Sequence, residues 1–526
     1  MGRNIFNSVL MPKVDSNSFD LSHDVKTSFQ MGEVVPTCVL DCVPGDSFTL
    51  SAENMLRFVP LVSPVMHQVK VDTRYFFVPT RLIWPEWEKW ITGESDVEAP
   101  YISVAGAEVG SLADYIGIPT GEYQTTIKTS PMALAAYVKI WNDYYRDQNL
   151  QTPYDETLTA GNNSLKFINW LADSPLRRAW EHDYFTSALP FAQKGDSVSI
   201  PLVSQDNLLV EYTYDGAAGV ARNTGLLRDA DNGNLTGNAA GYMKSNLGPA
   251  PFAQGGMQVE GSGGTGFVAY DPNGTLSVDV QADATDINTL RKAFSIQAWL
   301  EKNARGGTRY IENILAHFGV KSSDTRLNRP EYIGGTKQNM VISEVLATAQ
   351  STDDGVAVGS MAGHGISVGG GNTFNYRCEE HGFIIGVINV QPTTAYQQGM
   401  PRMHTRLDRL NYLWPSFANL GEQEVLQKEL YARSLTPEAV FGYVPRYAEY
   451  RFMNSRVSGE MRDSLAFWHM GRIFENEPAL NQEFIESNPT TRIFAVTDPA
   501  EDHIIAHIFN SISARRKLPR YGIPQL

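Results

Sequence analysis

The sequence has few cysteines, and this scarcity excludes one class of protein. Only Cys38, Cys42 and Cys378 occur in 526 residues. A secreted scaffold held together by disulfides would carry more, so we expect a fold that depends on packing in a reducing compartment. Cys38 and Cys42 are four residues apart, with no second pair and no nearby histidine. This spacing favours buried small hydrophobic residues over zinc ligands.

Long apolar runs and an excess of basic residues are also missing. The longest strongly apolar stretch, 383–390, is far shorter than the roughly 20 residues of a membrane-spanning helix. The first residues contain no continuous apolar core, so we expect no secretory signal. Lys and Arg total 43 against 58 Asp and Glu, and the net charge of -15 argues against one broad basic face for nucleic acid.

Basic residues instead gather at one place, near the end of the sequence. No acidic residue follows Asp502. Four bases stand close together after it: Arg515, Arg516, Lys517 and Arg520. Any contact with nucleic acid is therefore expected to be local.

The sequence offers no clear catalytic motif. Residues 365–369 spell GxSxG, but a nucleophile elbow needs a strand before the serine and a helix after it, and the glycines that follow disfavour a helix. Glu380 and His381 lack the spacing of a zinc-binding pair, and we expect His381 to be structural. A glycosidase-like pair of carboxylates stays open, although no spacing singles out two of them. We expect no enzyme activity, no catalytic residue, no bound metal and no cofactor.

Alternation of apolar and polar residues predicts strands. Between Asp46 and Phe77 the dominant period is two, and prolines mark the ends of the segments. Residues 383–390 are almost continuously apolar, which is typical of a strand covered on both faces. Residues 504–512 form another run compatible with a strand. Short strands with marked turns predict a sandwich or a barrel.

Helices are expected in three places. Ser130 and Pro131 precede an apolar stripe at helical spacing, made of Leu134, Val138, Trp141 and Tyr145. A second helical region is expected over 286–320, with a break at Gly306 and Gly307. Three tryptophans are predicted to share one face of a short helix packed on a sheet, although an exposed sugar-binding platform is the alternative: Trp84, Trp87 and Trp90.

Glycine is concentrated in one segment. Fourteen of the 44 glycines fall between Gly216 and Gly274, among many Asn, Ala and Ser residues. A loop of this length is usually functional or disordered, because its closure entropy must be offset by packing. We predict an exposed insertion over about 205–285.

A series of short strings resembles one known family, in order along the chain. They are Asp20–His23, Pro44–Phe48, Arg57–Leu61, Tyr75–Pro79 with the three tryptophans after it, Glu380–Phe383, Pro445–Tyr450 and Leu518–Gly522. Together they resemble the major capsid proteins of microviruses, especially the gokushovirus branch. The resemblance covers nearly the whole chain except the glycine-rich segment.

The resemblance implies a mainly β fold, namely an eight-stranded antiparallel viral jelly roll with long, partly helical insertions between strands. Residues 1–526 would form one such domain. Its parts would be a helix-containing insertion at 80–195, the glycine-rich surface insertion at 205–285, a helical segment at 286–320, and the last strand with a basic tail at 503–526. About sixty copies would close into a T=1 icosahedral shell around circular single-stranded DNA.

The resemblance also implies roles for two sets of residues. The glycine-rich insertion would form a protrusion at the threefold axes and face the host, and its candidate residues are Gly216, Asn232, Asn234, Tyr242, Phe252 and Gly274. The tail would face the packaged DNA, or else form salt bridges with acidic neighbours in the shell; its candidate residues are Arg515, Arg516, Lys517, Arg520 and Tyr521.

Implied partners are a small basic DNA-packaging protein, an internal scaffolding protein, a pilot protein and a host-cell receptor. The expected location is the virion, after assembly in the bacterial host cytoplasm. Two alternatives remain: a secreted carbohydrate-active or carbohydrate-binding β-sandwich, which predicts an export signal, and a bacterial enzyme with a β-sandwich accessory domain, which predicts a reactive centre. Metal ions between subunits also stay open, because carboxylate-rich contacts can bind calcium without a motif.

Overall fold

The computed structural model describes residues 16–196, 287–346, 361–496, 498 and 501–521, together with short strands between 208 and 278. The chain divides into two compact units, Met1–Asp196 with Trp299–Leu526, and Ser197–Ala298. Among the described residues, no helix has the length and apolarity needed to cross a membrane.

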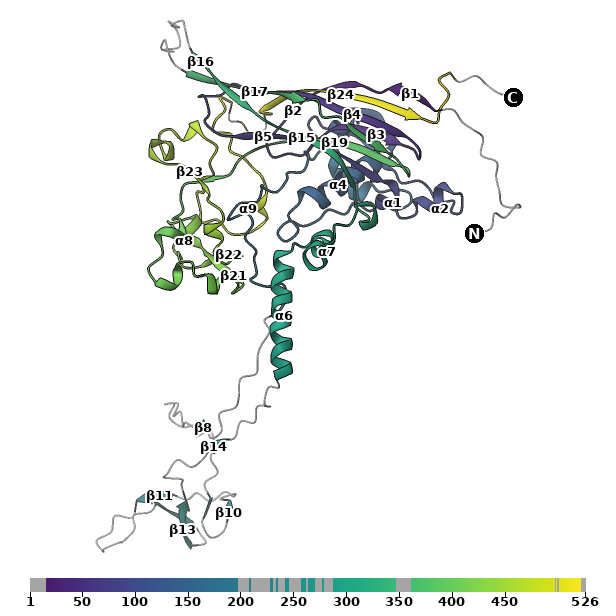
Figure 1. The fold of residues 1–526 in the computed structure, drawn as a ribbon. Helices are drawn as coiled ribbons and strands as arrows, with labels where there is room; N and C mark the ends of the chain where they lie inside the picture. The colour runs from purple at the N-terminus through teal and green to yellow at the C-terminus, as the bar shows by residue number, and fades with distance from the viewer. Residues whose placement is uncertain are drawn as a thin grey trace. The chain divides into compact units, whose positions relative to one another are not determined.

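Two antiparallel sheets form the core of the larger unit, and Figure 1 shows them as two layers. The first sheet contains β1 (Asn17–Asp20), β2 (His23–Phe29), β4 (Ser47–Phe58), β16 (Val341–Leu346), β17 (Met361–Gly370), β18 (Phe374–Arg377) and β24 (Ile504–Arg516). The second contains β3 (Val35–Cys42), β5 (Val69–Pro79), β15 (Glu331–Asn339) and β19 (Gly382–Pro392).

The order of the strands is that of a jelly roll. Neighbours in the first sheet run β2, β24, β4, β17, and those in the second run β15, β5, β19, β3. The chain crosses from one sheet to the other at almost every step, which gives the two interleaved Greek keys of this fold. The predicted mainly β, antiparallel jelly roll with helical insertions is thus confirmed. Strands β1, β16 and β18 extend the first sheet beyond four strands.

In the first sheet one face covers the core and the other is open, whereas β3, β5 and β19 of the second sheet are buried on both faces. Buried and exposed positions alternate along β4 and along β24, as a period of two requires when one face is covered. Two apolar clusters fill the space between the sheets. One is lined by Leu56, Val69, Val71, Ile388, Ile504 and Ile508, and the other by Phe48, Leu50, Tyr75, Phe77, Ile384 and Ile512.

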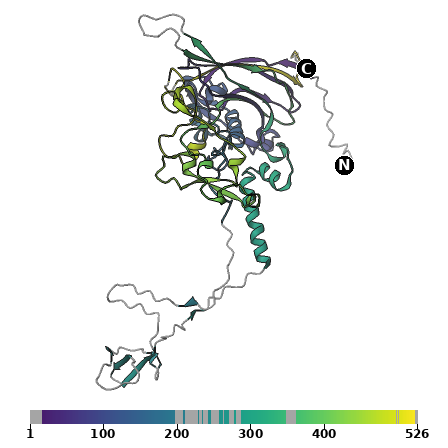
Figure 2. The same ribbon diagram turned by 60° about the vertical axis from the view of Figure 1, so that its left-hand side comes forward.

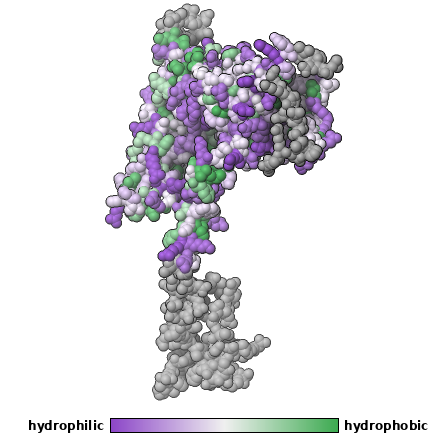
Figure 3. All heavy atoms as spheres, turned by 45° about the vertical axis from the view of Figure 1, so that its right-hand side comes forward, coloured by the Kyte–Doolittle hydropathy of each residue, from purple (hydrophilic) through white to green (hydrophobic). Residues whose placement is uncertain are grey.

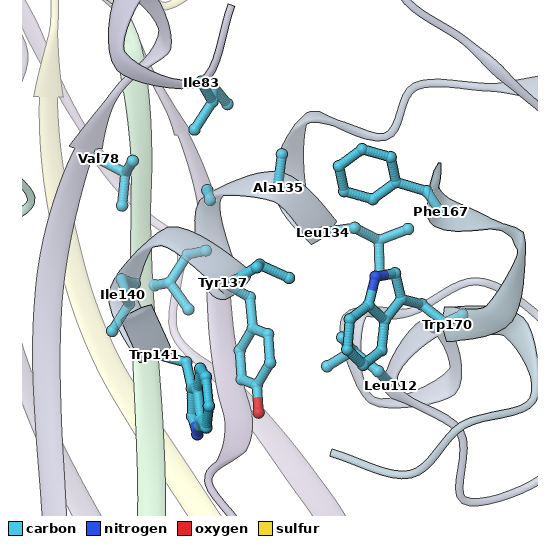
Figure 4. Packing of buried hydrophobic residues seen from close by; sticks show 14 of the residues in the cluster. Val78, Ile83, Leu112, Leu134, Ala135, Tyr137, Ile140, Trp141, Phe167 and Trp170 are labelled. Carbon is cyan, nitrogen blue, oxygen red and sulfur yellow. The ribbon is translucent and has the colours of Figure 1, made fainter. Parts of the chain in front are cut away.

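The outer face of the second sheet is covered by the insertion between β5 and β15. Its first part contains α1 (Thr80–Ile83), α2 (Trp87–Ile91), β6 (Ile102–Ala107), α3 (Leu112–Ile116), β7 (Gly121–Thr129), α4 (Met132–Ile140) and α5 (Ser164–Phe167). Figure 4 shows α4 between the sheet and the rest of this insertion, with Ile140 on the side of Val78 and Leu134 near Phe167 and Trp170. The four residues of the predicted stripe are buried, and the helix begins directly after Pro131, as predicted. Leu134 and Val138 lie on α4, whereas Trp141 and Tyr145 lie on the π-helical turn Trp141–Tyr145 that continues it.

The three tryptophans pack as predicted but do not share one helix. Trp87 and Trp90 lie on α2, whereas Trp84 follows α1. The ring centroids are 5.3 to 6.0 Å apart, and Trp84 is fully buried. Proline at position 85 separates the two helices, which explains the difference.

The second helical region also forms as predicted. It consists of α6 (Ile287–Arg305) and α7 (Tyr310–Phe318), separated at Gly306 and Gly307. Gly319 ends α7 in the left-handed conformation, with a φ of 68°.

A further insertion, between β19 and β24, lies to one side of the two sheets in Figures 1 and 2. It contains β20 (Ala395–Tyr396), β21 (Glu422–Leu426), α8 (Gln427–Leu430), β22 (Val440–Pro445), β23 (Ser455–Arg456) and α9 (Gln482–Ile485). The sequence did not predict this insertion, because its apolar residues follow no simple period.

The smaller unit contains short strands. They are β8 (Leu208–Leu209), β9 (Arg228–Asp229), β10 (Gly233–Asn234), β11 (Tyr242–Ser245), β12 (Met257–Gly261), β13 (Gly264–Ala269) and β14 (Ser277–Val278). Strands β9 to β13 form one sheet, and β14 pairs with β8. The boundaries predicted for the insertions remain predictions.

Candidate functional site

The outer face of the first sheet is open, and its basic residues form a row. Arg515 on β24 is the register partner of Ser18 on β1 and of Ser47 on β4. Ser47 in turn is the partner of Arg377 on β18. Partners across an antiparallel ladder point to the same face, so two guanidinium groups and two hydroxyls lie along one line. Both arginines are exposed.

Arg516 points the other way and binds its own chain. Its Nε lies 3.0 Å from Oδ2 of Asp46, its guanidinium donates to the carbonyl of Asp41, and it stands 5.5 Å from the ring centre of Phe48. Asp46 is only 1 % exposed. Arg516 therefore compensates a buried carboxylate, so its charge is already paired within the chain.

The residues after β24 are exposed. Lys517 lies over the turn at Gly45, and Leu518 accepts a hydrogen bond from the side chain of Asn17 at 2.8 Å. Arg520 and Tyr521 are exposed, Tyr521 to 77 %. For Arg515, Lys517 and Arg520, no ion pair forms among the described residues. Three of the four predicted bases are thus available to an external anion.

The centre of the same face is apolar and hollowed. A hollow of about 370 Å³ is lined by Glu53, Met55, Val368, His507 and Phe509, with neighbouring glycines of β17. His507 lies 3.0 Å from the carboxylate of Asp24. The face therefore carries basic, hydroxyl and aromatic groups beside the carboxylates of Asp24 and Glu53. The basic, hydroxyl and aromatic groups suit a sequence-independent contact with a nucleic acid.

The edge of the first sheet carries further exposed apolar side chains. Val341, Val345 and Leu346 of β16 and Met361 of β17 are between 42 and 63 % exposed. Figure 3 shows hydrophobic residues gathered at this end of the sheet. Within the described residues β16 pairs only with β17, so its other edge is free to meet another chain.

The motifs tested for catalysis are structural. Ser367 of the GxSxG string lies inside β17, is 1 % exposed and donates to the carbonyl of Asn339 at 3.0 Å. The guanidinium of Arg81 donates to both carboxylate oxygens of Glu380, at 2.7 and 3.1 Å, and forms a bidentate ion pair. The ring of His381 packs against Trp87, as the structural interpretation predicted.

The cysteines are buried, as predicted. Cys38, Cys42 and Cys378 are free and at most 2 % exposed. The hydrogen bond between the thiols of Cys42 and Cys378 favours the protonated form of Cys42. Together with burial, it raises the pKa of the Cys42 thiol far above its ordinary value. Among the described residues no group of three His, Cys, Asp or Glu side chains is placed to hold a metal ion.

The candidate residues of the glycine-rich insertion are placed only in part. Asn234 ends β10 and Tyr242 begins β11. The other four lie outside the described residues: Gly216, Asn232, Phe252 and Gly274. Sequence reasoning missed Arg377 and Asp46, because each takes its place through a strand pairing or an ion pair distant in sequence.

Comparison with known proteins identifies the family. The model of the family described as capsid protein (F protein) matches residues 8–526. The chain belongs to this family. It is 33 % identical to capsid protein VP1 of Chlamydia phage 1, over 100 % of this chain and 98 % of that protein. It is 35 % identical to capsid protein VP1 of Bdellovibrio phage phiMH2K, over 97 % of this chain and 95 % of that protein. It is 28 % identical to capsid protein VP1 of Spiroplasma virus 4, over 98 % of this chain and 96 % of that protein.

The predicted resemblance to microvirus capsid proteins is therefore confirmed. The chain is a major capsid protein, a structural component of the virion that assembles as an oligomer, and not an enzyme. The carbohydrate-binding alternative finds no support in these comparisons.

Proposed function

We propose that about sixty copies of this chain close into a T=1 shell around circular single-stranded DNA, in the cytoplasm of a bacterial host. The open face of the first sheet would be the DNA side. The observation that carries this assignment is the row of Arg515 and Arg377 with Ser18 and Ser47, on a chain whose net charge is -15. Local basic and hydroxyl groups bind phosphates without regard to sequence.

The basic residues at and after the end of β24 would extend this contact. Arg515, Lys517 and Arg520 would bind phosphates, Tyr521 would stack on bases, and Arg516 would hold the strand in place through Asp46. Sixty copies with three or four free bases each supply hundreds of charges, against on the order of thousands of phosphates. Other cations would therefore do most of the neutralisation, and a small basic packaging protein would help.

The glycine-rich insertion would form the threefold protrusion and meet a host-cell receptor. Its strands β9 to β13 pair with one another, so a small sheet of its own can present a surface. An internal scaffolding protein and a pilot protein would complete the assembly.

Expression of the chain with the other proteins of its phage tests the proposal. Negative-stain microscopy is expected to show closed particles of uniform size, and density-gradient fractions are expected to contain nuclease-protected single-stranded DNA. A chain that stays monomeric under these conditions would contradict the proposed shell. Particles that form but never protect DNA would leave the proposed shell intact. They would contradict only the assignment of the open face of the first sheet to DNA.

A further inference from the structure

A stretch of the insertion between β19 and β24 is fully exposed although it is rich in large apolar residues. Every residue of 407–416 is exposed, and we call this segment the apolar loop. Leu407 is 94 % exposed. Four more large side chains in it are between 43 and 51 % exposed: Leu410, Tyr412, Leu413 and Trp414.

Further exposed apolar side chains follow the loop in sequence or line a pocket together with Arg406, the residue before the loop. Leu420 is 63 % exposed, Phe452 46 % and Met453 80 %. Soluble monomers rarely expose so many large apolar side chains within one short stretch, and such patches mark surfaces that another molecule covers.

The loop is held in place by groups beneath it. The guanidinium of Arg406 stands 4.2 Å from the ring centre of Tyr450 and 3.3 Å from the carboxylate of Glu449. The side chains of Arg406 and Glu449 are each only 10 % exposed, so this ion pair is well shielded from water. A cation held between a ring and a carboxylate fixes the point where the loop begins.

Two tyrosines fix the far end of the loop. The hydroxyl of Tyr450 accepts a hydrogen bond from the backbone of Leu413 at 3.3 Å, and that of Tyr447 accepts one from the backbone of Trp414 at 3.2 Å. The indole of Trp414 donates to the carbonyl of Arg409 at 2.9 Å. The apolar side chains are therefore presented on an ordered backbone, which lowers the entropy lost when a partner covers them.

Charge indicates which partner fits. Residues 400–456 contain eight Lys and Arg and six Asp and Glu, a net charge of +2. The rest of the chain therefore carries -17, since the whole carries -15. The opposite net charges of this segment and of the remainder favour contact between the segment and the remainder of another copy of the same chain.

We propose that the apolar loop docks on a neighbouring copy of this chain in the shell. The inference rests on the proposed shell and names one of its contacts. The contact joins two different surfaces of the two copies, as a head-to-tail interface does, and such interfaces close into rings or shells when the rotation between copies closes. Leu407, Leu410 and Leu413 supply the apolar contact, and the net positive charge of residues 400–456 favours the negatively charged remainder of the neighbour.

A pair of double variants tests the apolar contact. Leu407→Asp with Leu413→Asp places two charges in the loop, whereas Leu407→Met with Leu413→Met keeps the side chains apolar and of similar size. Each chain is expressed with the other phage proteins, and particle yield is measured by sedimentation. We expect the aspartate variant to lose about tenfold or more of the particles and the methionine variant to match the wild-type chain. Circular dichroism of the soluble chains checks that both variants fold.

Equal particle yields from the wild-type chain and a folded aspartate variant would overturn the docking of the loop while leaving the shell intact. A wild-type chain that forms no particles would overturn the shell and this contact with it.

A photo-crosslinking amino acid at Leu410 tests the identity of the partner without disrupting the loop. We expect covalent dimers of this chain in purified particles, with the linked peptide outside 400–456 of the second copy. Particles in which position 410 links to a different protein, or to nothing, would overturn the proposal.

Discussion

The hydroxyl of Tyr75 on β5 donates a hydrogen bond to Oδ1 of Asn510 on β24, 2.9 Å away, and so joins the two sheets through the middle of the core. The amide of Asn510 donates to the carbonyl of Thr37 at 2.9 Å. Asn54 donates to Thr73 at the same distance nearby. Along β4 and β24, Asn54 and Asn510 each stand between the two apolar clusters. This polar layer fixes how one sheet lies over the other.

Tyr75→Phe should destabilise the chain, because it leaves the buried Oδ1 of Asn510 without its donor. We expect a loss of about 1 to 3 kcal/mol in the free energy of unfolding, measured by urea denaturation of the soluble chain. Tyr521→Phe removes a hydroxyl from an exposed side chain and is expected to change this free energy by less than about 0.5 kcal/mol. Equal stability of the Tyr75→Phe chain and the wild type would show that the bond contributes nothing.

Arg515 and Arg516 should differ sharply when each is replaced by alanine. Arg516→Ala leaves the buried carboxylate of Asp46 without its cation, at an expected cost of about 3 kcal/mol. Arg515→Ala removes an exposed charge and should have almost no effect on stability. Thermal unfolding of the two variants under the same conditions checks this difference. Similar melting temperatures would mean that Asp46 does not depend on Arg516.

The strands could be predicted from the sequence, but their pairing could not. Alternation predicts strands near β4 and β5, and the apolar run predicts β19. The pairing of β24 with β4 joins segments more than 400 residues apart, which no local pattern encodes. The run 504–512 also contains Ile505 and Phe509, which face outward at 56 and 36 % exposure. Apolarity alone therefore does not reveal the buried face.

For the basic cluster, the sequence predicted the group of residues but not the partner of each one. The sequence groups Arg515, Arg516 and Lys517 as one tail, yet the first two belong to β24. Ile512 and Ala514 point to the inner face, and a period of two therefore places Arg516 on the inner face as well. The inward position of Arg516 could thus have been predicted from the sequence. Its partner Asp46 could not be predicted, because the ion pair depends on how β24 lies beside the turn before β4.

Glu33 should make stability depend on pH. Burial raises the pKa of its carboxyl from 4.5 to about 7, although the amide of Gln30 and the charge of Arg177 lower it. The folded chain therefore holds this proton more tightly than the unfolded chain, and stability should fall as pH rises from 4.5 to about 7. Glu33→Gln removes this loss, so the variant should be the more stable chain at about pH 8, by up to about 3 kcal/mol.

The comparison needs both chains at two values of pH. Urea unfolding near pH 4.5 and near pH 8 should show similar stabilities at the lower value and a gap at the higher one. A gap that does not change with pH would exclude Glu33 as the titrating group.

Reversing charges at the end of β24 should reduce DNA packaging and not shell formation. Arg515→Glu with Lys517→Glu replaces two exposed bases by acids, so it repels phosphates without disturbing Asp46. We expect the ratio of DNA-filled to empty particles to fall about twofold or more, measured on a density gradient. The matched control, Lys89→Glu with Lys321→Glu, changes the net charge equally at exposed sites elsewhere. A similar loss of filling in the control would assign the effect to net charge.

Removing the glycine-rich insertion should abolish adsorption while leaving assembly intact. Leu209 on β8 and Ser277 on β14 are register partners, so their Cα atoms lie about 5.5 Å apart or less. A short Gly-Ser linker can therefore join them in place of the residues between, with little strain on the rest of the chain. Particles should form in normal yield, and binding to host cells should be lost. Normal infection by such particles would rule out the insertion as the host-facing element.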